Sequence, residues 1–142
     1  MSVVKSKRSE NKLEVLMHAF NTAEYTIKIC TNEKNFPKRY RWCITNKIVE
    51  EVLEMNALLQ RANAIYFTSD PKFEEDYKMR HKYQTKALGL TYSLLSYVDL
   101  AYRTFGIDAN RVSHWADMIT HEQVLIRKWK KADEQRFYMG NG

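Results

Sequence analysis

The sequence has few of the residues that interrupt regular structure. Glycine occurs four times and proline twice among 142 residues. A β-sandwich of this length needs many turn signals, so their scarcity excludes that fold class. Few long elements are favoured instead. The length predicts one domain that buries most of its apolar side chains without cross-links.

Cysteine is also scarce, and its two positions fit no metal-binding spacing. Cys30 continues the apolar stripe of its segment, which predicts a small buried side chain there. The sequence leaves open whether Cys30 pairs with Cys43.

Segments for export or membrane insertion are missing. The cations within residues 5–8 are followed by no apolar region of the kind that a signal peptide needs. The longest apolar tract, 87–105, contains Asp99 and Arg103 and is too polar to cross a bilayer. We therefore expect a cytoplasmic protein without a membrane partner.

Apolar residues recur at spacings of three and four, the period of amphipathic helices. The clearest helix is 71–105, with Asp70-Pro71 as a start signal and Gly106 as a stop signal. Its seam is Phe73, Tyr77, Arg80, Gln84, Ala87, Thr91, Leu94, Val98, Ala101 and Phe105.

Three further helices are predicted around it. The first is capped by Ser9 or Asn11 and ends near Thr31, the second is capped by Thr45, and the fourth is capped by Asp108. Their apolar stripes are Leu13, Leu16, Met17, Phe20, Ala23, Ile27 and Cys30, then Ile48, Val52, Met55, Leu59, Ala62 and Tyr66, and finally Val112, Trp115, Ile119, Ile126 and Trp129.

One long connection, 33–43, and two short ones join these helices, the first of them the tight turn 68–71. Short turns place consecutive helices antiparallel. The predicted fold class is therefore all-α, an antiparallel up-down-up-down four-helix bundle over residues 9–137. Residues 1–8 are expected to form a disordered basic arm, and residues 138–142 a frayed C-terminus.

Two features inside the third helix need an explanation. Gly89 costs about 1 kcal/mol relative to alanine, and we expect it to permit the close approach of a neighbouring helix. Asp99 lies four residues before Arg103, which predicts an exposed ion pair.

The charge is unevenly distributed. The formal net charge is +6, and three acid-free clusters hold much of it: five cations in 34–47, four in 78–86 and four in 127–131. Clustered cations favour an anionic partner, either nucleic acid or an acidic protein. Contacts with phosphates carry little base specificity. The candidate contacts are Lys34, Lys38, Arg39, Arg41, Lys78, Arg80, Lys82, Lys86, Arg127, Lys128, Lys130 and Lys131.

Two of these clusters also have a structural explanation. In 33–43, Phe36, Tyr40 and Trp42 could pack over the end of the bundle while the cations face water. In 127–131, cations near a helix C-terminus complement the helix dipole, and Trp129 belongs to the core. The loop 33–43 could serve structure and binding with opposite faces, and the four cations of 127–131 exceed what capping a helix needs.

Catalysis finds no support in the sequence. It has no glycine-rich phosphate loop and no nucleophile motif, so we expect neither an enzyme nor a cofactor. His114, Asp117 and His121 could share one side of the fourth helix, but their spacing matches no established metal-ligand signature. We expect a polar outer face there and no metal.

Several short motifs follow one another in a characteristic order. They are Phe36-Pro37-Lys38, Ile48-Val49-Glu50-Glu51-Val52-Leu53 after Thr45, Tyr83-Gln84 with Ala87-Leu88, Leu94-Leu95, and Ile126-Arg127-Lys128-Trp129. In this order, over about residues 12–133, the chain resembles a four-helix-bundle family with two groups. One comprises the accessory variability determinant proteins of diversity-generating retroelements. The other comprises proteins encoded in intervening sequences of large-subunit ribosomal RNA genes. The insert Arg39-Tyr40-Arg41-Trp42 departs from the plainer loop of much of the family.

The resemblance implies a homo-oligomeric ring, typically a pentamer, with a basic surface. It also implies a non-enzymatic accessory protein that binds a reverse transcriptase and its template RNA and supports mutagenic cDNA synthesis. DNA is a second candidate nucleic-acid ligand. The alternative is a protein–protein assembly module, or a general RNA-binding bundle of the intervening-sequence type.

Overall fold

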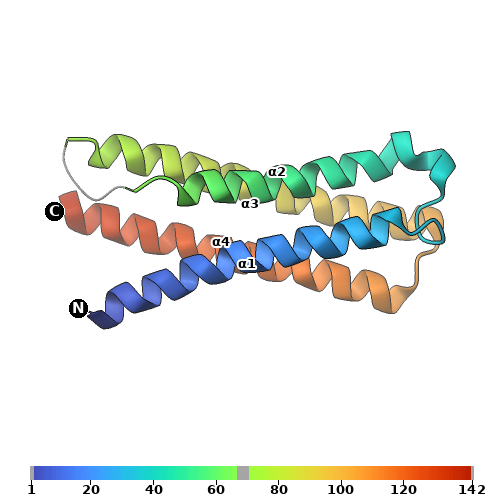
Figure 1. Cartoon of the computed structure of the whole chain (residues 1–142), viewed down its shortest axis with the longest axis horizontal. Helices are drawn as coiled ribbons and strands as arrows, with labels where there is room; N and C mark the ends of the chain where they lie inside the picture. Colours follow the sequence, from blue (N-terminus) through green and yellow to red (C-terminus); the bar gives the residue numbers. More distant parts are fainter. Residues whose placement is uncertain (1, 67–70, 142) are drawn as a thin grey trace.

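The computed structural model describes residues 2–66 and 71–141, and the side chains of residues 12–66 and 71–139. Within these ranges the chain forms four long helices and no strand: α1 (Ser2–Thr31), α2 (Asn46–Asn63), α3 (Phe73–Phe105) and α4 (Ala109–Asn141). A short 3-10 helix (Lys38–Tyr40) and a π-helical turn (Arg41–Thr45) connect α1 to α2. Consecutive helices run in opposite directions (Figure 1), which confirms the predicted bundle.

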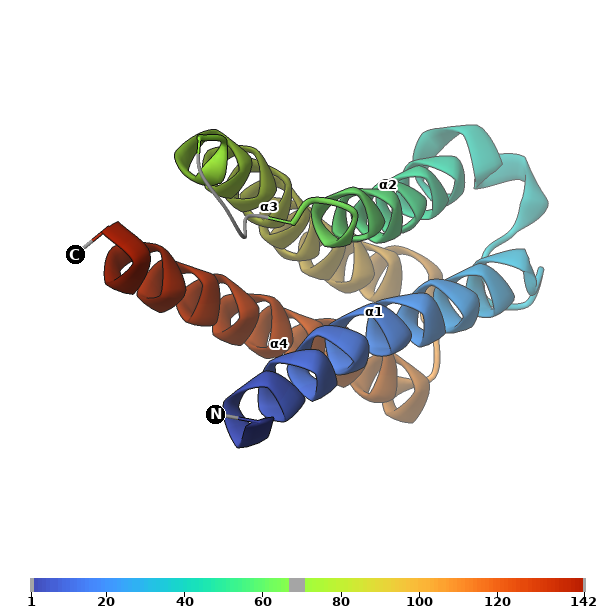
Figure 2. The same cartoon turned by 60° about the vertical axis from the view of Figure 1, so that its left-hand side comes forward.

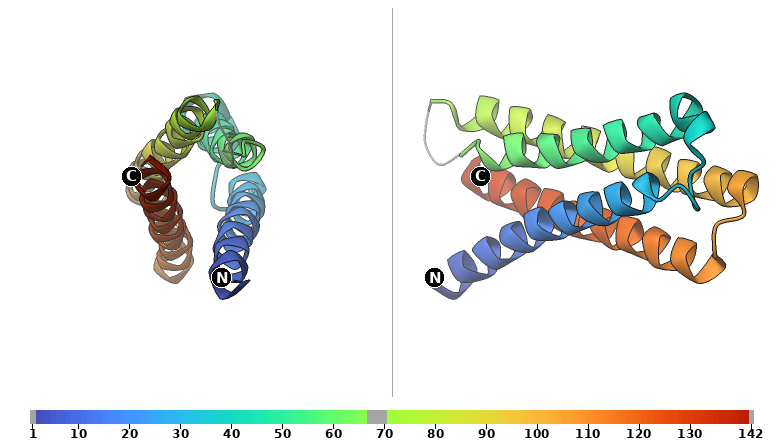
Figure 3. Two further views of the ribbon diagram at one scale, coloured as in Figure 1. Left: turned by 90° about the vertical axis from the view of Figure 1, so that its left-hand side faces the viewer. Right: turned by 45° about the vertical axis from the view of Figure 1, so that its right-hand side comes forward.

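Each helix packs on its neighbours in the chain, and α4 closes the bundle by packing on α1. Viewed from other sides, α1 crosses α4 obliquely and diverges from α2 toward the N-terminus (Figures 2 and 3). None of the helices in the described ranges combines the length and the apolarity that crossing a membrane requires.

The seam predicted for α3 is the buried face of that helix. Every seam residue from Tyr77 to Ala101 is buried, and the two terminal phenylalanines are half-buried. Gly106 ends the helix at φ 66°, a conformation that costs glycine little, and donates its N–H to the Tyr102 carbonyl. The start differs from the prediction, because α3 begins at Phe73 without a side-chain cap. Residues 68–70 of the predicted turn and cap lie outside the described residues.

Helix α1 buries only part of the predicted stripe: Ala23 and Cys30 are buried, and Leu16 and Ile27 are half-buried. Leu13, Met17 and Phe20 are each more than half exposed. Small residues can be buried instead because α4 presents large ones, among them the fully buried Trp115, whose indole N–H donates to Thr26 Oγ1 at 3.0 Å. The buried positions of α1 are Val15, Ala19, Thr22, Ala23, Thr26, Ile29 and Cys30.

The stripes predicted for α2 and α4 are largely confirmed. The stripe residues of α2 are buried as predicted, namely Ile48, Val52, Met55, Leu59 and Ala62. Tyr66, predicted to continue the stripe, is exposed. In α4, Trp115, Ile119, Ile126 and Trp129 are buried and Val112 is half-buried.

The helix ends differ from prediction in three further places. Helix α1 begins at Ser2 and runs through the segment for which the sequence predicted disorder, and α4 continues to Asn141. Thr45 makes no side-chain cap, because its backbone is itself helical and the π-helical turn leads directly into α2. Asp108 caps α4 as predicted, with Oδ2 accepting from the Arg111 N–H at 3.1 Å.

Three single-residue expectations have clear outcomes. Gly89 is exposed, and an added Cβ would meet no atom within 4 Å, so the predicted close helix approach is wrong. Asp99 and Arg103 form the predicted exposed ion pair at 3.3 Å. Cys30 is buried as predicted, which raises the pKa of its thiol to about 12, and both Cys30 and the exposed Cys43 are free.

Candidate nucleic-acid interface

Arg80 does not belong to the surface on which the sequence placed it. Its side chain is only 4% exposed, and Nε and Nη2 donate to the two carboxylate oxygens of Asp133 at 2.8 and 3.0 Å. Nη1 donates to the Ile65 carbonyl at 3.1 Å, and the guanidinium lies over the ring of Trp129. A guanidinium held in this way cannot reach a phosphate, so the prediction of a binding contact at Arg80 is wrong.

Asp133 joins Arg80 to a further seam residue. The amide nitrogen of Gln84 donates to Asp133 Oδ2 at 2.7 Å. Burial raises the pKa of Asp133 and lowers that of Arg80, because both charges have left water. The three side chains form a buried polar network that fixes how α3 lies along α4.

Because α3 lies along α4 in this way, the cationic clusters 78–86 and 127–131 lie side by side. Nearby, His81 Nε2 lies 3.4 Å from Glu134 Oε1, and the guanidinium of Arg127 lies over the Tyr92 ring at 5.5 Å. The first half of α3 therefore runs beside the second half of α4, as the ribbon also shows (Figure 3). We call the cations on the outer sides of this pair the α3–α4 basic surface: Lys78, Lys82, Lys86, Arg127, Lys128, Lys130 and Lys131.

Most of these cations carry uncompensated charge. Lys78 pairs with Glu74 one turn earlier at 3.0 Å, while the other six form no salt bridge with any residue that the structure describes. Lys130 is half-buried and the rest are exposed. An array of this kind, drawn from two rigid helices, is suited to contacting successive phosphates.

The third cluster lies at the opposite end of the bundle, in the connection between α1 and α2 (Figure 1). Phe36 is buried against the rings of Phe105 and Trp115, and Tyr40 packs on Phe105 at 5.5 Å between centroids. Trp42, in contrast, is 88% exposed. We call the exposed Lys34, Lys38, Arg39, Arg41 and Trp42 the loop basic surface.

The structural explanation offered for this connection is confirmed in part. Phe36 and Tyr40 pack over the end of the bundle, whereas Trp42 and the cations face water. From Lys86 to Phe105, on which Tyr40 packs, the helix rises about 30 Å at 1.5 Å per residue. A ligand that contacts both basic surfaces must therefore span about 30 Å, close to one turn of a nucleic-acid duplex.

A second buried polar site lies between α1 and α4, and sequence reasoning missed it. Glu122 is 0% exposed, and its Oε1 lies 2.8 Å from Nδ1 of His18. Burial raises the pKa of Glu122 to about 9 and lowers that of His18, so at neutral pH the pair holds one proton between them. The break in the apolar stripe at 122–123 was the signal that could have revealed it.

The histidines of α4 are engaged in ring contacts. His121 meets His18 edge to face at 4.7 Å, and His114 meets Tyr25 at 5.1 Å. Asp117 is exposed. Among the side chains that are described, no group of three or more His, Cys, Asp or Glu has an arrangement that could hold a metal ion.

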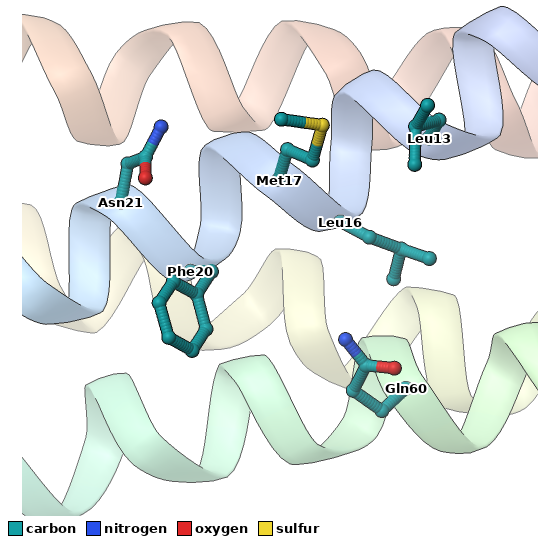
Figure 4. A pocket seen from close by; sticks show the side chains of 6 residues that line it. All are labelled: Leu13, Leu16, Met17, Phe20, Asn21 and Gln60. Carbon is teal, nitrogen blue, oxygen red and sulfur yellow. The ribbon is translucent and has the colours of Figure 1, made fainter.

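An apolar surface lies where α1 diverges from α2. Of the α1 side chains there, Leu16 and Phe20 point toward α2, which carries Gln60 (Figure 4). They border an open groove of about 340 Å³. Its lining residues are Leu13, Leu16, Met17, Phe20, Asn21 and Gln60.

No family model, curated protein or solved structure matches this chain. Function must therefore be inferred from the two basic surfaces, the apolar groove and the buried polar sites themselves.

Proposed function

We propose that this protein is a non-enzymatic RNA-binding protein that contacts the phosphate backbone. The observation that carries the proposal is the α3–α4 basic surface, in which two helices locked by a buried network present a group of cations that mostly lack acidic partners. Phosphate contacts of this type fix position without reading sequence. DNA is therefore a second candidate ligand.

A more specific role is supported by the family resemblance of the sequence. In that role the protein is a cytoplasmic accessory of a diversity-generating retroelement. It would bind the reverse transcriptase and the template RNA, and so support mutagenic cDNA synthesis. Two basic surfaces about 30 Å apart would allow one bundle to contact RNA at one end while the other end contacts the enzyme or more RNA.

Reversing two charges on the α3–α4 basic surface should weaken RNA binding. For Lys128→Glu with Lys131→Glu we expect about tenfold lower affinity for RNA. The binding constant should also fall less steeply with salt concentration, by the equivalent of about two phosphate contacts, because each lysine neutralises one phosphate. Gel-shift titrations at several salt concentrations measure both quantities. Circular dichroism should show unchanged helicity, since both side chains are exposed.

The matched control changes the same net charge elsewhere. Lys28→Glu with Arg61→Glu alters two exposed cations that already pair with Glu24 and Glu54, and it should leave affinity within about twofold. Absence of RNA binding by the unaltered protein at about 50 mM salt, where phosphate contacts are strong, would contradict the proposal.

The apolar groove favours a second role, assembly with further copies of the chain. Leu13, Met17 and Phe20 recur on one side of α1 and leave an apolar stripe in water. Adjacent exposed apolar residues mark interaction surfaces more often than scattered ones do. We propose that another subunit covers this stripe in a homo-oligomer, for which the resemblance implies a pentamer.

Placing charge in the groove should disrupt the oligomer. Met17→Lys with Phe20→Lys puts two ammonium groups where a neighbour would bury apolar area, so we expect a smaller species by light scattering at the same protein concentration. Leu100→Lys changes an isolated exposed leucine of α3 and should leave the mass unchanged. A monomeric unaltered protein would refute self-association.

A further inference from the structure

Trp42 is unusual among the tryptophans of this chain. The sequence has three, of which Trp115 and Trp129 are buried, whereas Trp42 is 88% exposed. Tryptophan is highly buried on average, because its large ring gains much from leaving water. A ring left in solvent is therefore a candidate for contact with a ligand.

The exposed ring stands on a well-anchored backbone. Trp42 lies in the π-helical turn Arg41–Thr45, whose Ile44 and Thr45 are buried. On its other side, Tyr40 packs on Phe105. Single π-helical turns occur frequently at functional sites. The turn thus holds the indole outside the bundle on a rigid support.

The surroundings of the ring are cationic. Arg39 and Arg41 are exposed, and the stretch from Lys34 to Lys47 contains no acid. The guanidinium of Arg39 lies over the ring of Tyr40 at 5.4 Å, so a positive charge is held close to the turn. An aromatic plane bordered by arginines complements a polyanion that also carries flat rings.

We infer that Trp42 is a stacking platform for an unpaired base of RNA, with Arg39 and Arg41 contacting the adjoining phosphates. This inference rests on the proposed RNA binding and adds the kind of RNA that is preferred. In a duplex each base already stacks on its neighbours, so its face is not available to a protein ring. An unpaired base offers that face, and every base has one, so the contact discriminates single strands from duplexes without reading sequence.

The three tryptophans make the contact directly observable. Since Trp115 and Trp129 are buried, acrylamide quenching of the intrinsic fluorescence reports mainly on Trp42. A single-stranded oligouridylate RNA of about 15 nucleotides, within the site size of one single-strand-binding module, should protect Trp42 from the quencher. A duplex of the same length should bind through phosphates and leave the quenching unchanged.

Variants at the turn separate stacking from charge. Trp42→Ala should lower affinity for the single strand by between about 5-fold and 100-fold and leave duplex affinity within twofold, whereas Trp42→Tyr should retain part of the preference. Arg39→Gln with Arg41→Gln should lower the affinity for both the single strand and the duplex. Tyr138→Ala, which removes an exposed aromatic ring near the C-terminal end of α4, is the matched control and should change neither affinity.

The failures of this inference and of RNA binding are distinguishable. The stacking platform is refuted if the unaltered protein binds both RNAs and Trp42→Ala lowers the affinity for neither. It is also refuted if acrylamide still quenches Trp42 when the single strand is bound. In both cases phosphate binding stands. If the unaltered protein binds neither RNA at about 50 mM salt, both proposals fail.

Discussion

Replacing Asp133 by alanine is expected to destabilise the protein by about 3–5 kcal/mol, the cost of removing one partner of a buried ion pair. Arg80 would stay in the core after losing both of its bonds to Asp133. Gln84 would lose its acceptor as well. This cost is a large fraction of the stability of an ordinary domain.

Urea unfolding followed by circular dichroism measures the change. Asp99→Ala, which breaks an exposed pair on the same helix as Arg80, is the control and should cost no more than about 0.5 kcal/mol. The double variant Arg80→Met with Asp133→Leu should recover most of the loss, because apolar residues of similar size need no compensation. Equal costs for Asp133→Ala and Asp99→Ala would show that the buried network does not stabilise the bundle.

Replacing Glu122 by glutamine should remove a loss of stability at alkaline pH. With its pKa raised from 4.5 to about 9, Glu122 keeps its proton in the folded chain and loses it in the unfolded chain. Stability therefore falls as pH rises through that interval. His18, whose pKa is lowered from 6.5, contributes the opposite slope below its ordinary value. The net fall is expected between about pH 6.5 and pH 9.

The glutamine variant should match the parent below about pH 4.5, where the carboxyl is protonated in both states, and should gain on it by about 1.4 kcal/mol per pH unit above that. Its amide N–H can donate to Nδ1 of His18, the atom that lies 2.8 Å from Glu122 Oε1 in the parent. Thermal unfolding at a series of pH values tests this. Glu24→Gln removes an exposed carboxylate of the same helix as His18, one that pairs with Lys28, and it should keep the parental slope. A slope unchanged by Glu122→Gln would overturn the assignment.

The fold was predictable where buried positions are apolar and the helix is long. The seam of α3 was found because its spacing continues through Arg80 and Gln84 although both are polar. In helix α1, Leu13, Met17 and Phe20 were assigned to the core wrongly, because the alanines and threonines that are buried there carry little hydropathy signal. Their burial depends on the size of Trp115 across the interface, and the spacing within α1 contains no information about α4.

The sequence predicted which cations belong to the candidate site. It did not predict that they form two separate surfaces at opposite ends of the bundle. All candidate contacts except Arg80 are exposed or half-exposed, as charge clustering indicated. The partners of the buried polar groups lie far away in the sequence: Asp133 is 53 residues from Arg80, and Glu122 is 104 residues from His18. One chain without an alignment offers no means of pairing such positions. Trp42 and Tyr40 likewise could not be told apart until their environments were known.

The contrast between the two cysteines makes the loop basic surface open to chemical labelling. The Cys30 thiol is buried, with its pKa raised to about 12, so it yields almost no thiolate at neutral pH. Cys43 is exposed and follows Trp42 directly in the chain. A maleimide dye added near pH 7 would therefore attach at a single position beside the proposed stacking platform. The native chain thus has a built-in attachment point for a reporter of ligand binding, without any engineered residue.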